Sequence, residues 1–171
     1  MNNTIAFNQA SEGSALFADG FDQNAQVTNN ILFGIDGEAV VSVGDFNDQN
    51  DPSFINNLFF AINAAEIENN FSQVLGVNGN FVADPLFVDA SNGDFHLTAG
   101  SLAIDAGLDS GIAGQLLLDF DGNARFIDGD GDLIATVDLG AFEFSSVPEP
   151  SSIVLFGFAP FATLRRRRAR A

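Results

Sequence analysis

The chain has 171 residues, with 23 acidic residues, six arginines and no lysine, and its net charge is −17. The acidic residues all precede Ser151, and an acidic body of this kind repels the phosphates of DNA and RNA, which argues against nucleic-acid binding by that part of the chain. The apolar content of 46% excludes a disordered acidic chain, and the length is sufficient for one domain with a hydrophobic core. Because cysteine is absent, disulfides, thiol catalysis and thiolate metal sites are excluded as well.

Residues 1–80 contain an alternating apolar pattern that repeats after 27 positions. The first set is Val27, Asn29, Ile31, Phe33 and Ile35, and the second set is Phe54, Asn56, Leu58, Phe60 and Ile62. Alternation with period two is typical of one buried face of a β-strand. A period in the twenties with several short strands predicts a solenoid of parallel β-coils.

Each set places an asparagine among apolar neighbours, and these asparagines form a series along the chain. A step of 26 back from Asn29 reaches Asn3, and a half step of 13 forward from Asn56 reaches Asn69. We expect each buried amide to bond to its counterpart in the next coil, as stacked amides do in cross-β ladders. The alternative is that these residues are only the turn composition of an asparagine-rich chain.

Residue 1 is already in phase with this repeat, and no capping element precedes it. The first eight residues also lack the basic start and apolar stretch of an export signal. We therefore expect the chain to be the C-terminal portion of a longer protein.

Residues 81–146 consist of short apolar strands broken by Asp-Gly and Asn-Gly turns, and we expect them to close the last coil. The order of the pieces Asp84-Pro85-Leu86-Phe87, Gly100 to Gly107 and Val137 to Glu143 resembles the terminal region of bacterial choice-of-anchor proteins. That resemblance implies a right-handed parallel β-helix outside the cell, without implying one activity. Leu102 departs from it, since relatives are expected to have proline there. Within this region Arg125 is expected to pair with Asp119 or Asp121.

Residues 147–171 reverse the composition of the rest of the chain. Pro148, Glu149 and Pro150 precede a 12-residue apolar run, residues 153–164, and then the basic residues Arg165, Arg166, Arg167 and Arg168. The run is shorter than the roughly 20 residues that span a bilayer, but flanking serines and arginine stems bring it near a minimal span. We expect a short membrane helix whose arginine end stays in the cytoplasm. The alternatives are a disordered basic tail or a nucleic-acid patch.

This order of parts resembles the PEP-CTERM sorting signal of Gram-negative bacteria. The resemblance implies that exosortase, a membrane protease, recognises the Pro148-Glu149-Pro150 motif and processes the exported protein. The chain would then occupy the inner membrane transiently and afterwards the cell surface or the extracellular matrix. The predicted domains are therefore coils in 1–80, a closing region in 81–146 and a sorting signal in 147–171.

Asp128, Asp130 and Asp132 place three carboxylates at alternate positions of a glycine-rich loop, which suits calcium. The EF-hand pattern fails, because Leu133 stands where glycine is required and Leu139 where a bidentate glutamate is required. The alternative is a solvated acidic turn.

No residue is predicted to be catalytic or to bind an organic cofactor. His96, the single histidine, is expected to make a local hydrogen bond, and Arg125 cannot supply both the base and the cations that a polysaccharide lyase needs. We expect a non-enzymatic structural or adhesive protein that contacts exopolysaccharide. One alternative is a fragment of a polysaccharide-degrading β-helix lyase or glycosidase whose catalytic coils are missing. Another is a membrane protein that is anchored without processing.

Overall fold

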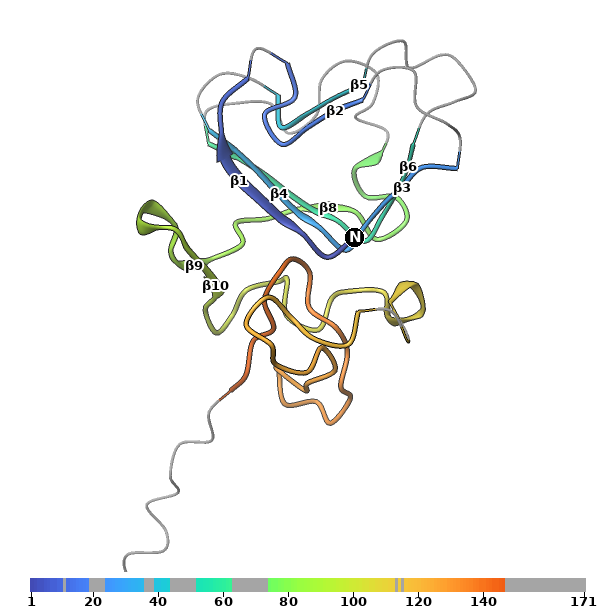
Figure 1. Ribbon diagram of the computed structural model, residues 1–171, viewed down its shortest axis with the longest axis vertical. Helices are drawn as coiled ribbons and strands as arrows, with labels where there is room; N and C mark the ends of the chain where they lie inside the picture. Colours follow the sequence, from blue (N-terminus) through green and yellow to red (C-terminus); the bar gives the residue numbers. More distant parts are fainter. Residues whose placement is uncertain are drawn as a thin grey trace, which may run out of the picture.

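The computed structural model describes residues 1–10, 12–18, 24–35, 39–43, 52–62, 74–112, 114 and 116–146. These residues form an all-β protein (Figure 1), as the sequence predicts, and their only helical segments with assigned bounds are the single-turn 3-10 helices η2 (Ala90–Asn92) and η3 (Asp109–Gly111). The strands are β1 (Thr4–Asn8), β2 (Leu16–Ala18), β3 (Gln26–Thr28), β4 (Ile31–Ile35), β5 (Val41–Val43), β6 (Ser53–Ile55), β7 (Leu58–Ile62), β8 (Phe81–Val82), β9 (Phe87–Asp89) and β10 (Asp94–Leu97).

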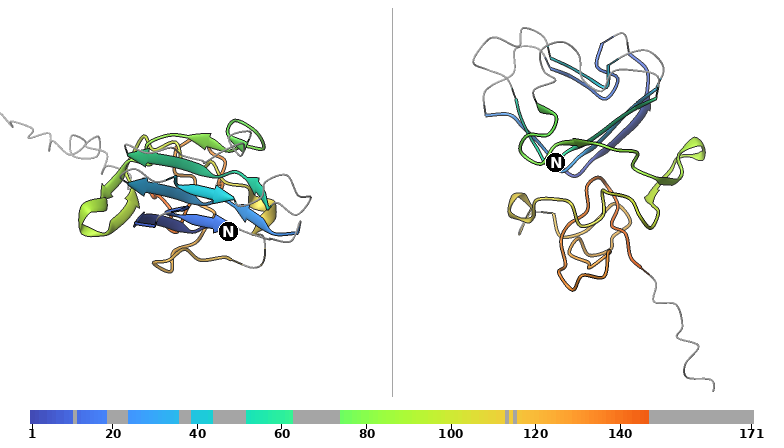
Figure 2. Two further views of the ribbon diagram at one scale, coloured as in Figure 1. Left: turned by 90° about the horizontal axis from the view of Figure 1, so that it is seen from above. Right: turned by 180° about the vertical axis from the view of Figure 1, so that it is seen from behind.

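Three parallel sheets surround the upper core in Figure 1. Their strand orders are β1-β4-β7-β8, β2-β5 and β3-β6. The chain passes through β3, β4 and β5 in turn, one strand in each sheet, and then returns to the sheet of β3 with β6. Equivalent strands of successive passages therefore lie side by side (Figure 2). We call one such passage a circuit.

The pairing register confirms the 27-residue repeat. Val27 lies opposite Phe54 between β3 and β6, and Ile31 and Phe33 lie opposite Leu58 and Phe60 between β4 and β7. Parallel pairing continues from β7 to β8, where the step shortens to 23 residues. A sequence period that puts apolar strands directly above one another therefore sets this part of the fold.

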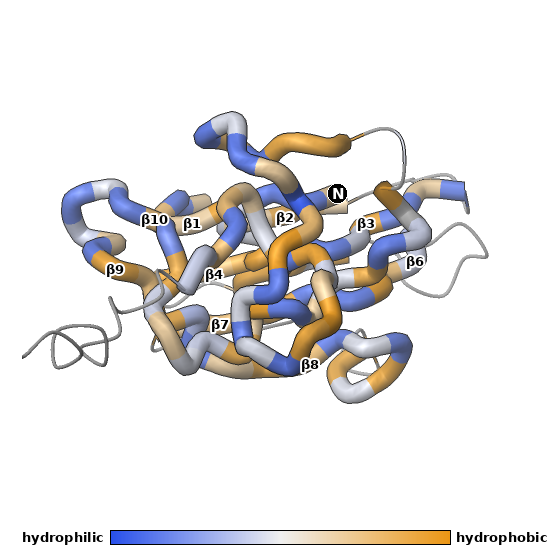
Figure 3. Tube along the Cα trace, turned by 90° about the horizontal axis from the view of Figure 1, so that it is seen from below, coloured by the Kyte–Doolittle hydropathy of each residue, from blue (hydrophilic) through white to orange (hydrophobic). Residues whose placement is uncertain are grey.

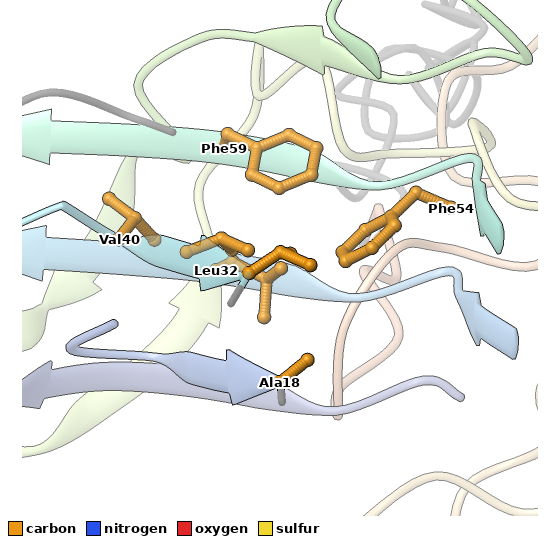
Figure 4. Packing of buried hydrophobic residues seen from close by; sticks show 7 residues of the cluster. Ala18, Leu32, Val40, Phe54 and Phe59 are labelled. Atoms are coloured by element: carbon orange, nitrogen blue, oxygen red, sulfur yellow. The ribbon is translucent and has the colours of Figure 1, made fainter. Parts of the chain in front are cut away.

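The four-stranded sheet β1-β4-β7-β8, which we call the central sheet, has apolar residues buried on both of its faces. The alternating sequence pattern predicted only one buried face. Leu32 of β4 and Phe59 of β7 face the interior of the circuits, where they pack with Val40, Phe54 and Ala18 (Figure 4). Ile31 and Leu58, which belong to the predicted buried face, lie on the opposite side against residues of the closing segment. The predicted core face is therefore an outer face that residues 81–146 cover.

Pairs of adjacent asparagines form the corner between the sheet β3-β6 and the central sheet, and their arrangement differs from the predicted ladder. The first member of each pair, Asn2, Asn29 or Asn56, has a positive φ of 51°, 57° or 48°, a conformation that asparagine tolerates better than most residues. The stacked amides belong to the second members, Asn3, Asn30 and Asn57, and continue to Asn80.

Two parts of the predicted ladder therefore change. Asn3 pairs with Asn30, 27 residues away, rather than with Asn29. Asn69, the predicted half step, lies outside the described residues.

The first asparagine of each pair bonds to the closing segment, and Asn29 also donates its side-chain amide to Oδ1 of Asn2 at 3.3 Å. The Asn29 side chain donates to the Leu108 carbonyl at 3.1 Å and accepts from the Leu108 N–H at 2.8 Å. The Asn56 amide donates to the carbonyl of Ala106 at 3.1 Å. Each corner therefore directs one asparagine into the ladder and one toward the residues that follow β8, most of which lie below the central sheet in Figure 1.

No helix of the described residues is long and apolar enough to cross a membrane. Figure 3 shows short hydrophobic stretches that alternate with hydrophilic ones along the described chain. The expected membrane helix, the Pro148-Glu149-Pro150 motif and the arginines 165–168 all lie outside the described residues.

Candidate functional site

A buried ion pair occupies the centre of the closing segment. Arg125 is 3% exposed, and its Nη1 lies 3.0 Å from Oε1 of Glu143. The same guanidinium donates to the carbonyl groups of Gly140 and Ala141 at 3.0 and 3.2 Å. The predicted partners of Arg125 were therefore wrong. Glu143 lies 18 residues further along the chain and becomes adjacent only when the chain returns.

The carboxylate of Asp119 is unavailable to Arg125 because it organises the turn that follows it. It accepts the backbone N–H groups of Asp121 and Asn123 at 3.0 and 2.7 Å, and that of Glu143 at 3.1 Å. Burial alone would raise the pKa of Asp119, but the hydrogen bonds from Glu143, Asn123 and Asp121 together outweigh burial and lower it. This carboxylate is therefore a structural acceptor.

Asp138 and Glu143 are buried beside each other, and backbone N–H groups bind both of them. Asp138 accepts from the N–H groups of Asp105 and Phe144 at 2.7 and 2.6 Å, and Glu143 accepts from the Asp138 N–H at 3.1 Å. Burial raises the pKa of Asp138 to about 6 and that of Glu143 to about 8. No short motif marks this group, since its members are brought together from distant parts of residues 105–144.

His96 joins β10 to the turn after Asp119. Its Nδ1 lies 2.6 Å from Asp94 and its Nε2 lies 2.7 Å from Asp121. The hydrogen bonds to Asp121 and Asp94 raise the pKa of His96, because two ionised carboxylates, which only accept, require a proton on each ring nitrogen. The expected local hydrogen bond is present as the contact to Asp94, whereas the contact to Asp121 comes from tertiary structure.

Carboxylates of the predicted calcium loop gather at one point. Oxygen atoms of Asp128, Asp130 and Asp105 lie within 4.8 Å of one another. Asp105 was not predicted, because it lies 23 residues before the loop and packs beside it only in the fold. Its Oδ2 accepts the N–H groups of Gly129 and Asp130 at 2.9 and 2.8 Å.

Asp132 is not part of this group, and it binds its own backbone instead. Its Oδ1 accepts the N–H of Ile134 at 2.7 Å, and the Asp128 carboxylate accepts those of Gly131 and Leu133. Leu133 has φ of +75° and is 91% exposed. The loop therefore adopts, at leucine, the left-handed turn for which an EF-hand uses glycine.

An aromatic groove lies on the outer face of the central sheet. Its volume is about 370 Å³, and its lining includes the rings of Phe7, Phe60 and Phe87 with Asp84 at its edge. A register shift beside Phe7 in β1, where φ is +58°, places this ring in a stack with Phe33 at a centroid distance of 4.8 Å. The groove thus exposes aromatic faces beside one carboxylate.

The described chain ends at Ser146, and comparison with known proteins concerns the residues that begin there. Residues 146–168 match the PEP-CTERM protein-sorting motif. The matched range contains the Pro148-Glu149-Pro150 motif and the arginines 165–168. A PEP-CTERM motif implies an exported surface protein that exosortase sorts and processes. No curated protein and no solved structure matches the chain.

Proposed function

We propose that this protein is a structural or adhesive component of the cell surface or extracellular matrix. The observation that carries the proposal is how the described chain uses its buried polar side chains. Every buried asparagine, aspartate and glutamate among the described residues bonds to the chain's own backbone or to another of its side chains. Such a use of polar groups builds a rigid frame instead of presenting reactive groups to a substrate.

We further interpret the parallel sheets as circuits of a right-handed parallel β-helix of the choice-of-anchor type. The support is the 27-residue register between β1, β4 and β7, which is interrupted by one shift near the end of β1, and the asparagine ladder at one corner. A stack of this kind offers long, stiff surfaces and depends only on contacts between neighbouring circuits. This architecture suits a surface protein that holds or spaces other components.

The aromatic groove is the surface that we assign to exopolysaccharide contact. Ring faces of Phe7, Phe60 and Phe87 suit the apolar face of a sugar ring, and Asp84 can accept a hydroxyl hydrogen bond. The net charge of −17 favours a neutral or cationic polysaccharide over an acidic one. Binding of the full chain to purified matrix polysaccharide, compared with a Phe7→Ser variant, measures this assignment.

Replacement of Pro148, Glu149 and Pro150 by alanine tests the sorting part of the proposal. We expect the variant to keep its full length and to accumulate in the inner membrane fraction, because exosortase no longer recognises it. Immunoblots of membrane and extracellular fractions give both size and location. Replacement of Asp89, Ser91 and Asn92, which are exposed, provides a matched control with three changes. An unaltered size and location of the Pro-Glu-Pro variant would instead support a membrane protein that is anchored without processing.

Calcium is the ion that the cluster of Asp105, Asp128 and Asp130 would hold, through hard oxygen ligands. We expect millimolar calcium to raise the melting temperature of the full chain by about 3 °C or more, since the ion binds only the folded loop. Asp105→Asn should remove the shift, whereas Asp132→Asn should retain it because Asp132 lies outside the cluster. Equal melting temperatures with and without calcium would rule out the site.

The alternative of a polysaccharide-degrading enzyme stays a prediction, with no observation among the described residues that favours it. Release of unsaturated or reducing sugars from matrix polysaccharide by the purified chain would support it over the structural role.

A further inference from the structure

At one end of the parallel sheets the outermost strands are β1, β2 and β3. We call this surface the open end. Each of these strands pairs on one side only, with β4, β5 and β6 respectively. Within the part of the chain that the structure describes, no strand pairs with their other side. Their outward backbone groups are therefore available to a further strand.

The open end has the composition of a buried surface. The three strands contain no charged residue, although the whole chain has 23 acidic residues and six arginines. Soluble proteins usually protect a free edge with charged side chains or proline. A groove of about 160 Å³ also opens here between the apolar side chains of Ile5, Leu16 and Val27.

The hydrogen bonds of the asparagine ladder all run in one direction, away from the open end. Oδ1 of Asn30 accepts from the backbone N–H of Asn3 at 3.0 Å and from its side-chain amide at 3.1 Å. Asn57 receives the same two bonds from Asn30, and Asn80 receives them from Asn57. Each ladder oxygen is thus bound by the backbone and the side chain of the asparagine one circuit earlier.

The two ends of the ladder differ. At the far end, the Asn80 amide donates to the carbonyl groups of Phe54 and Val77, both at 2.8 Å, so the series is closed. At the open end, Asn3 is exposed, and its Oδ1 accepts no hydrogen bond from the described residues. Each later ladder oxygen accepts a backbone N–H and a side-chain amide, and Oδ1 of Asn3 accepts neither from the described residues.

We propose that the open end binds a further circuit of β-strands that runs parallel to β1 and carries an asparagine in the ladder position. That asparagine would donate its backbone N–H and its side-chain amide to Oδ1 of Asn3. A second copy does not fit as well. Its far end has no free ladder amide, and its own open end would run antiparallel and bring two acceptor oxygens together.

The experiment adds a circuit by placing a second copy of residues 1–27 in front of Met1 of the full chain. The repeat of 27 then keeps the register, with Met1 in the place that Thr28 holds in the next circuit and the added asparagine one step before Asn3. We expect the melting temperature to rise by about 5 °C or more, because a further strand and its apolar side chains become buried. Amide exchange at Thr4, Ile5 and Ala6 should slow by about tenfold or more.

Two controls of equal length keep this result specific. An Asn→Ala change in the added copy of Asn3 should reduce the temperature shift measurably, because it removes the side-chain donor to Asn3 and keeps only the backbone donor. A scrambled extension should give no shift and no protection of β1. The proposal is overturned if the intact extension has no effect, or if the scrambled extension has the same effect. It is also overturned if light scattering shows that the unextended chain is a dimer whose β1 amides are already protected, since a second copy then covers the open end.

Discussion

At the scale of single residues, the closing segment depends on charges that are buried and paired. Arg125 is the only basic residue before the C-terminal tail, and it lies in the interior with three intramolecular acceptors. Its Nε has no hydrogen-bond partner among the residues that the structure describes, and the bonds to the guanidinium come from its two terminal nitrogens. An ion pair of this kind is costly to break, because removing one partner leaves the other charge without compensation.

Above the Glu143 pKa of about 8, Arg125→Met should lower the free energy of unfolding by about 3–5 kcal/mol, because the ionised Glu143 carboxylate would remain buried without a cation. Urea denaturation of the full chain measures this loss. Addition of Glu143→Gln should recover about half of it or more, since the amide oxygen still accepts from the Asp138 N–H without a buried charge. A double variant no more stable than Arg125→Met would show that lost packing, and not the unpaired carboxylate, causes the effect.

At the scale of secondary structure elements, the ladder asparagines hold each circuit at a fixed spacing from the next. Asn30 is 3% exposed and both donates and accepts within the ladder. Its alanine variant would remove one of the two donors to the Asn57 oxygen, and it would remove the oxygen that accepts the backbone N–H and the side-chain amide of Asn3. A buried polar group without a partner costs more than the bond itself contributes.

Asn30→Ala should therefore lower the free energy of unfolding by about 2–3 kcal/mol, whereas Asn92→Ala should change it by about 0.5 kcal/mol or less. Asn92 is the matched control, because it is exposed and its amide binds only the neighbouring Asp89. Chemical denaturation of both variants gives the comparison. A similar loss for the two would mean that the ladder does not contribute to stability.

The same elements show how far a sequence pattern reaches. The 27-residue period predicted the strand partners, because equivalent apolar residues must stack in successive circuits. It did not separate Asn29 from Asn30, since both recur with the same period and only the positive φ at Asn29 turns that side chain toward Leu108. The aromatic groove was not predicted either, because its rings come from four strands and depend on the bulge in β1.

At the scale of the whole molecule, Glu143, Asp138 and His96 all make stability fall as pH rises above about 5. Glu143 and Asp138 have pKa values of about 8 and 6 in the folded chain, above their ordinary values of 4.5 and 3.8. The unfolded chain therefore releases these protons at lower pH than the folded chain does. Their stabilising contribution is present below the ordinary values and is lost as pH rises through the folded values. His96, with its raised pKa, acts in the same direction above pH 6.5.

The melting temperature should therefore fall by about 5 °C or more between about pH 5 and about pH 8.5. Thermal melts followed by circular dichroism at constant ionic strength measure this change. In Glu143→Gln the fall should be smaller, because one of the titrating groups is absent. A melting temperature that rises over this range would contradict the assignment.

The sequence alone determined two properties of this protein. The sorting motif is local in the chain, so its order of parts can be read without a fold, and the range of residues 146–168 agrees with that reading. The circuits are periodic, and a period fixes which strands meet. The tertiary structure alone decided that Arg125 pairs with Glu143, that Asp105 joins Asp128 and Asp130, and that the closing segment covers the outer face of the central sheet. These contacts join residues without a common period, so only the folded path of residues 81–146 brings them together.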